Sequence, residues 1–182
     1  MAKDYTKDLK IIFAGFGGQG LLFAGKIVAQ AGLLDGKEVS WLPSYGPEMR
    51  GGTCNCSVTV SSEPVGSPLV VEPDVVVAMN QPSVYKFIEA VVPGGFLIVD
   101  STLVPDIPER DDITIIKVPS TQLADEAGFK QLANVILTGK LYAETKFCSK
   151  EAIDAALTKI IPARKAKLLE PNQKALAMGM DL

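Results

Sequence analysis

The strongest constraint on the fold is a glycine-rich segment that follows a short apolar run near the start of the chain. Residues 10–14 are almost entirely apolar, which is typical of a central strand buried on both faces. Gly15-Phe16-Gly17-Gly18-Gln19-Gly20 then leads into residues 21–31, whose spacing predicts a helix with one apolar face formed by Leu21, Ala24, Ile27, Val28 and Ala31. A strand, a glycine turn and a helix in this order are typical of an α/β domain.

The rest of the chain alternates predicted strands with predicted helices. Strands are expected at residues 39–42, 53–60, 75–79, 96–99 and 113–118; helices at 81–91, 123–127 (capped by Ser120 or Thr121), 131–141, 149–161 and in a tail interrupted by Pro171. No helix separates the second and third strands, which predicts a mixed sheet. We therefore expect a three-layer α/β/α sandwich with a mixed, mostly parallel sheet and a Rossmann-like first βαβ unit. Residues 1–182 should form a single domain, with a peripheral tail from about residue 162.

Composition excludes several classes of function. A net charge of −3 argues against nucleic-acid binding, and no apolar run approaches the length that spans a bilayer. The charged N-terminal residues do not resemble a secretory signal, so we expect a cytoplasmic protein. The chain has no histidine and only three cysteines, too few for an ordinary iron–sulfur cluster. We therefore expect neither catalytic residues nor a metal site in this chain.

The glycine turn has the spacing of a dinucleotide fingerprint, and a helix N-terminus attracts anions. The second predicted strand, however, ends in Leu42-Pro43-Ser44, without the acid that holds the ribose of NAD or FAD. The turn could also serve only close packing of helix on strand. The near match to a P-loop at Gly20, Gly25 and Lys26 fails because Ile27 replaces the Ser or Thr that would bind Mg²⁺.

A second candidate loop spans residues 43–52 and contains two prolines and three glycines. We expect the strand before it to lie next to the first strand, so that both loops leave the carboxyl edge of the sheet, where α/β proteins bind ligands. Ser44, Tyr45, Arg50, Gly51 and Gly52 are then candidate contacts, with Arg50 suited to a phosphate or carboxylate. An ordinary exposed loop with a Glu48–Arg50 ion pair is the alternative.

Two further groups of residues are expected to be structural. Cys54 and Cys56 should share one face of a strand as small buried side chains. Asp100, Ser101 and Thr102 should form a cap and turn at a strand end.

Together, the two loops give the chain a specific resemblance. Gly15 to Gly20 and the run Pro-Ser-Tyr-Gly-Pro-Glu-Met-Arg-Gly-Gly-Thr at residues 43–53 resemble the gamma subunits of 2-oxoacid:ferredoxin (acceptor) oxidoreductases, most closely the 2-oxoglutarate or branched-chain branch. Similar segments follow at Pro93-Gly94-Gly95, Pro119-Ser120-Thr121, residues 134–139 and Asn172-x-x-Ala175-x-x-x-Gly179. The resemblance covers nearly the whole chain.

The resemblance implies a subunit of an enzyme that oxidatively decarboxylates a 2-oxoacid with coenzyme A to acyl-CoA and CO₂, reducing ferredoxin. Thiamine diphosphate and iron–sulfur clusters are then expected on alpha, beta and possibly delta partner subunits. By the same resemblance, coenzyme A is expected to be shared with this chain, through Gly15, Gly17, Gly18, Gln19, Gly20 and the second loop. A free-standing nucleotide- or CoA-binding module and a purely structural adaptor are the alternatives.

Overall fold

A mixed β-sheet forms the middle layer of the chain in a computed structural model that describes residues 3–44, 53–129 and 131–182. Within these residues six strands are ordered β2-β3-β1-β4-β5-β6. The elements are β1 (Asp8–Phe16), α1 (Leu21–Leu34), β2 (Glu38–Ser44), β3 (Thr53–Ser61), β4 (Val75–Ala78), α2 (Gln81–Phe87), the 3₁₀ helix η1 (Ile88–Ala90), β5 (Phe96–Asp100), β6 (Thr114–Val118), α3 (Ser120–Glu126), α4 (Ala133–Thr145), α5 (Lys150–Ile160), the 3₁₀ helix η2 (Ala163–Leu168) and α6 (Leu169–Asp181).

The strand directions confirm the predicted mixed, mostly parallel sheet. β1, β4, β5 and β6 pair in parallel, whereas β3 pairs antiparallel with both β1 and β2. The expectation that the first two strands are neighbours is wrong, because β3 lies between them. β2 still runs parallel to β1, since each is antiparallel to β3. The carboxyl ends of β1 and β2 therefore lie at the same edge of the sheet.

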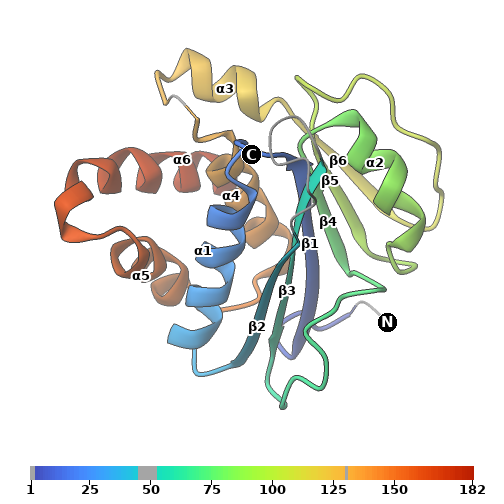
Figure 1. Cartoon of the computed structure of the whole chain (residues 1–182), viewed down its shortest axis with the longest axis horizontal. Helices are drawn as coiled ribbons and strands as arrows, with labels where there is room; N and C mark the ends of the chain where they lie inside the picture. Colours follow the sequence, from blue (N-terminus) through green and yellow to red (C-terminus); the bar gives the residue numbers. More distant parts are fainter. Residues whose placement is uncertain (1–2, 45–52, 130) are drawn as a thin grey trace.

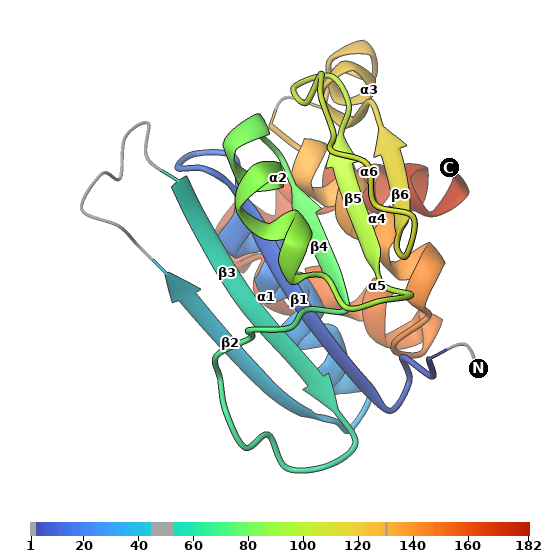
Figure 2. The ribbon, with the colours of Figure 1, turned by 90° about the vertical axis from the view of Figure 1, so that its right-hand side faces the viewer.

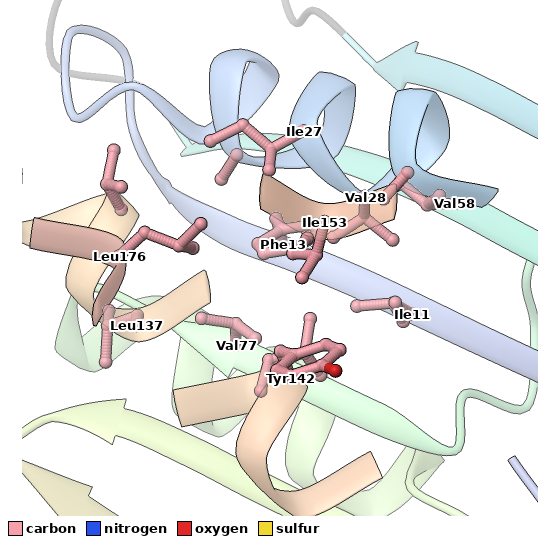
Figure 3. Packing of buried hydrophobic residues seen from close by; sticks show 14 of the residues in the cluster. Ile11, Phe13, Ile27, Val28, Val58, Val77, Leu137, Tyr142, Ile153 and Leu176 are labelled. Carbon is pink, nitrogen blue, oxygen red and sulfur yellow. The ribbon is translucent and has the colours of Figure 1, made fainter. Parts of the chain in front are cut away.

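Helices cover the two faces unequally, which gives the expected three layers (Figures 1 and 2). α1, α4, α5 and α6 lie on one side, and α2 crosses the other side over β1 and β4. Figure 3 shows the larger core, in which Phe13 of β1 lies among side chains of α1 and α5, including Ile27, Val28 and Ile153. The smaller core lies under α2 and includes Ile12, Val76 and Val84.

Several predicted boundaries need correction. β2 continues through Pro43 to Ser44; proline is tolerated there because β2 is an edge strand. Pro171 does not interrupt the last helix, since it occupies the first turn of α6, where its missing N–H costs no helical hydrogen bond. Neither Ser120 nor Thr121 caps α3. Its first turn is bonded instead to Asp100 at the end of β5, which accepts from Thr121 Oγ1 at 2.5 Å.

The C-terminal region packs closely on α4 through two glycines. A Cβ atom on Gly139 would overlap the carbonyl oxygen of Leu176, and one on Gly179 would overlap that of Ile136. Leu176 is almost fully buried against the larger core. The 3₁₀ turn η2, by contrast, contributes no buried residue. Among the described residues no helix combines the length and apolar character that a bilayer crossing requires.

Candidate functional site

The glycine turn joins the carboxyl end of β1 to the N-terminus of α1, as predicted. Phe16, Gly17 and Gly18 are exposed at the edge of the sheet, and Gln19 and Gly20 are partly buried. Gly18 has a φ of +100° and Gly20 a φ of +78°, both in the left-handed region that favours glycine. The turn therefore depends on glycine at these two positions for its backbone path.

Gln19 fastens the turn to the neighbouring strand. Its Oε1 accepts a hydrogen bond from the N–H of Phe16 at 2.6 Å, and its Nε2 donates to the carbonyl of Met79, just after β4, at 2.8 Å. A Cβ atom on Gly15 would lie only 2.5 Å from Gln19 Oε1, so Gly15 leaves the space that this amide occupies. Both ends of the Gln19 amide thus bond backbone atoms, which gives the residue a role in holding the turn. Its predicted contact with a cofactor stays a prediction.

Asn134 holds the turn from the opposite side. It lies in the first turn of α4, and its Nδ2 donates to the carbonyl of Gly20 at 2.9 Å. Sequence reasoning did not single out this residue as part of the site. Because it is 114 positions from Gly20, only the packing of α4 beside α1 brings the two together.

The N-terminus of α1 presents backbone amides without acceptors in the described part of the chain. These are the N–H groups of Gly18, Gly20, Leu21 and Leu22. The first turn of α1 contains no acidic residue that would offset the partial positive charge of the helix terminus. The arrangement is chemically suited to an anionic group.

The second candidate loop is only partly within the described residues. Ser44 is the last residue of β2 and pairs with Asn55 of β3, and Thr53 pairs with Phe16 at the start of the glycine turn. The two ends of the connection thus lie at the edge where the glycine turn lies. Tyr45, Arg50, Gly51 and Gly52, with Glu48, lie outside the described residues, so their predicted contacts stay predictions.

Buried polar atoms without partners gather at or just after the carboxyl ends of the parallel strands. Of six such side-chain atoms in the described residues, three belong to Asn80, Ser83 and Ser120, which follow β4 and β6, and a fourth is Asn134 Oδ1 beside Gly20. Buried polar groups in proteins are normally satisfied by protein or by ordered water. Their concentration here distinguishes this edge from the rest of the described structure.

Asp100, Ser101 and Thr102 form the expected cap and turn. The Asp100 carboxylate is fully buried, and its Oδ1 accepts from the N–H of Thr102 at 3.1 Å and of Thr121 at 3.3 Å. It thereby joins the end of β5 to the start of α3.

The cysteines also occupy structural positions. Cys54 and Cys56 share the face of β3 that packs under α1, as predicted, but only Cys56 is buried, whereas Cys54 is partly exposed. Burial raises the pKa of the Cys56 and Cys148 thiols to about 12, so neither is a ready nucleophile or metal ligand at neutral pH. Within the described residues no three metal-binding side chains cluster.

Comparison with known proteins identifies the family. A family model described as pyruvate ferredoxin/flavodoxin oxidoreductase matches residues 10–182. The chain belongs to this family. The predicted resemblance is thus confirmed, and the match includes the glycine turn, β2 and the tail.

Two curated relatives share more than a third of their aligned residues with the chain. The ketoisovalerate oxidoreductase subunit VorA of Methanothermobacter marburgensis is 38% identical over 96% of this chain, which spans only 36% of that relative's length. The 2-oxoglutarate synthase subunit KorC of Methanocaldococcus jannaschii is 37% identical, over 95% of this chain and 92% of the relative. These names belong to the branched-chain and 2-oxoglutarate branches that the second loop predicts.

A solved structure has the same fold over nearly its whole length. It is the gamma subunit of a keto/oxoacid ferredoxin oxidoreductase from Geobacter sulfurreducens, with a TM-score of 0.82 and 32% identity. The alignment covers 95% of this chain and 96% of that chain. The α/β architecture described above is therefore that of a gamma subunit of this family.

Proposed function

We propose that this chain is the gamma subunit of a multi-subunit enzyme that converts a 2-oxoacid, coenzyme A and oxidised ferredoxin into acyl-CoA, CO₂ and reduced ferredoxin. Family membership and the full-length match to a gamma subunit support the proposal. Alpha, beta and possibly delta subunits are the proposed partners, and ferredoxin reaches the chain only through the complex. A cytoplasmic location is part of the same proposal.

The decarboxylation and the electron transfer are assigned to the partner subunits. Three cysteines in 182 residues do not fit a four-thiolate cluster, and Cys56 and Cys148 are buried in packed positions. Thiamine diphosphate and iron–sulfur clusters are therefore proposed to be held by the partners. The roles proposed for this chain are therefore to bind and position coenzyme A and to assemble with the partner subunits.

Coenzyme A is the proposed ligand of the carboxyl edge, in a site shared with a partner subunit. The observation that carries this proposal is the row of amides without acceptors in the described chain at the N-terminus of α1, held in place by Gln19. A phosphate group matches both the donors and the sign of the helix dipole. Ser44, Tyr45, Arg50, Gly51 and Gly52 are proposed to complete the site from the second loop.

A charge placed on Gly18 tests the proposal in the assembled complex. A Cβ atom there would have no neighbour within 4 Å, so Gly18→Asp should add a negative charge at the helix N-terminus without meeting another atom, and the backbone strain of its positive φ is shared by Gly18→Asn. We expect the KM for coenzyme A to rise about tenfold relative to Gly18→Asn, with kcat nearly unchanged, because repulsion acts on the phosphates. Both Asp and Asn tolerate the left-handed region.

Gly36→Asp is the matched control. Gly36 also has a positive φ, +74°, and open space around its Cβ position, but it follows the opposite end of α1. The control should leave the KM for coenzyme A unchanged. Equal KM values in Gly18→Asp and Gly18→Asn would refute coenzyme A binding at the glycine turn. Arg50→Ala tests the second loop independently, since it should raise the KM for coenzyme A or weaken subunit association.

A further inference from the structure

We propose that Asn134 is the positioning residue of the glycine turn: it fixes the Gly20 carbonyl and so orients toward their ligand the α1 amides that have no acceptor among the described residues. The identification of the ligand as coenzyme A rests on the function proposed above, whereas the positioning role rests on the contacts of Asn134. The side chain is 3% exposed and lies between α4 and the start of α1.

The Gly20 carbonyl accepts three hydrogen bonds, which is one more than its two lone pairs ordinarily serve. The N–H groups of Phe23 and Ala24 donate to it from inside α1, each at 3.0 Å. Asn134 Nδ2 donates from outside the helix at 2.9 Å. The two internal bonds would form in any helix that begins here, so the third is the bond that ties this terminus to the rest of the molecule.

The shapes of Gly20 and Asn134 are complementary. A Cβ atom on Gly20 would lie 2.6 Å from Asn134 Nδ2, so the amide fills the space that the missing side chain leaves. Glycine is thus required at position 20 for two reasons: the Asn134 amide leaves no space for a side chain, and the φ of +78° favours glycine. The contact is therefore specific to this pair of residues.

Asn134 is itself held on a rigid support. The next three residues of α4, Val135, Ile136 and Leu137, have no exposed surface, and Thr138 Oγ1 donates to the carbonyl of Asn134 at 2.8 Å. With Gln19 bonded to Met79 on the other side, the turn is anchored at both α4 and the end of β4. Small displacements of the amides are thereby restricted.

The side-chain oxygen of Asn134 indicates that this contact lowers stability. Asn134 Oδ1 is buried and has no hydrogen-bond partner among the described residues. A buried acceptor without a donor lowers stability, and an apolar side chain of the same size would avoid that loss. A residue that costs stability at the edge of a candidate site is expected where it serves the site.

The test compares Asn134→Ala with Asn172→Ala in the full chain and in the assembled complex. Asn172 is a close match: it is 4% exposed, its Nδ2 donates to the carbonyl of Leu168 at 2.7 Å, and its Oδ1 also lacks a partner in the described residues. Amide hydrogen exchange should rise about three- to tenfold in the segment from Gly15 to Phe23 for Asn134→Ala only. The KM for coenzyme A should rise by a similar factor in the complex while kcat stays nearly constant.

Asn134→Leu separates positioning from simple stability. Leucine has the same branched shape as asparagine and removes the unpartnered oxygen, so the variant should unfold at an equal or higher denaturant concentration while the turn still exchanges faster. Unchanged exchange in Asn134→Leu and Asn134→Ala would overturn the positioning role, whatever the KM. Faster exchange with an unchanged KM for coenzyme A would support the positioning role and count against coenzyme A as the ligand.

Discussion

Gly20 combines two constraints that can be separated by substitution. Its φ of +78° makes any other L-residue costly, and its contact with Asn134 leaves no room for a Cβ atom. Gly36 has nearly the same φ, +74°, but open space around it. A pair of alanine substitutions therefore distinguishes the steric cost from the backbone cost.

We expect Gly36→Ala to lower the free energy of unfolding by about 1 kcal/mol, the cost of a left-handed alanine. Gly20→Ala should cost at least about 1 kcal/mol more, because the methyl group meets the Asn134 amide. In an Asn134→Ala background the excess should disappear, which a double-mutant cycle by urea denaturation would measure. Additive effects of Gly20→Ala and Asn134→Ala would show that the two residues are not in contact.

At this scale the sequence identified the turn but not the contacts that hold it. The spacing of Gly15, Gly17 and Gly20 was sufficient, because a glycine turn between a strand and a helix is a local property. The inward direction of Gln19 depends on the Met79 carbonyl, and the role of Asn134 depends on a helix more than a hundred residues away. Such contacts arise only when the elements pack.

The elements show the same division between local and long-range information. The sequence of the connection between the second and third predicted strands, which is rich in proline and glycine, was enough to predict a mixed sheet. It did not reveal that β3 would lie between β1 and β2, because the strand order depends on long-range pairing between strands. Pro43 and Pro171 were interpreted as breaks, yet an edge strand and a first helical turn both accept proline.

The crossing of α4 and α6 gives a prediction at the scale of elements. The helices approach so closely that a Cβ atom on Gly139 or Gly179 would overlap a backbone carbonyl of the other helix. Backbone atoms cannot turn aside as a flexible side chain can. Gly139→Ala and Gly179→Ala should each lower the free energy of unfolding by about 2 kcal/mol or more, measured by chemical denaturation.

Gly66→Ala is the control for this pair, since Gly66 has an ordinary φ and no atom within 4 Å of its Cβ position. It should change stability by no more than about 0.5 kcal/mol. If the two helix variants were as stable as this control, α6 would not pack on α4 as described here.

For the whole molecule, the alternation of strands and helices predicted the three layers. The absence of histidine and the three cysteines argued against a histidine-based catalytic site or an ordinary iron–sulfur cluster formed by this chain alone. What the sequence could not provide was the distribution of unsatisfied groups. Buried atoms of Asn80, Ser83, Ser120 and Asn134 lack partners in the described chain at or near one edge of the sheet. Such a concentration is consistent with an edge that is completed by water, a ligand or another subunit.

The last prediction concerns the isolated chain. One helix N-terminus contributes at most about 2 kcal/mol to binding an anion, whereas micromolar affinity requires about 8 kcal/mol. Because the described part of the site supplies little beyond backbone amides, coenzyme A titrated into the purified chain should show no binding at micromolar concentrations. Binding should appear once the partner subunits are added, and isothermal titration calorimetry would measure both. Micromolar binding by the chain alone would favour a free-standing coenzyme A module. If the KM of the complex for coenzyme A did not change in Gly18→Asp, a purely structural adaptor would be favoured.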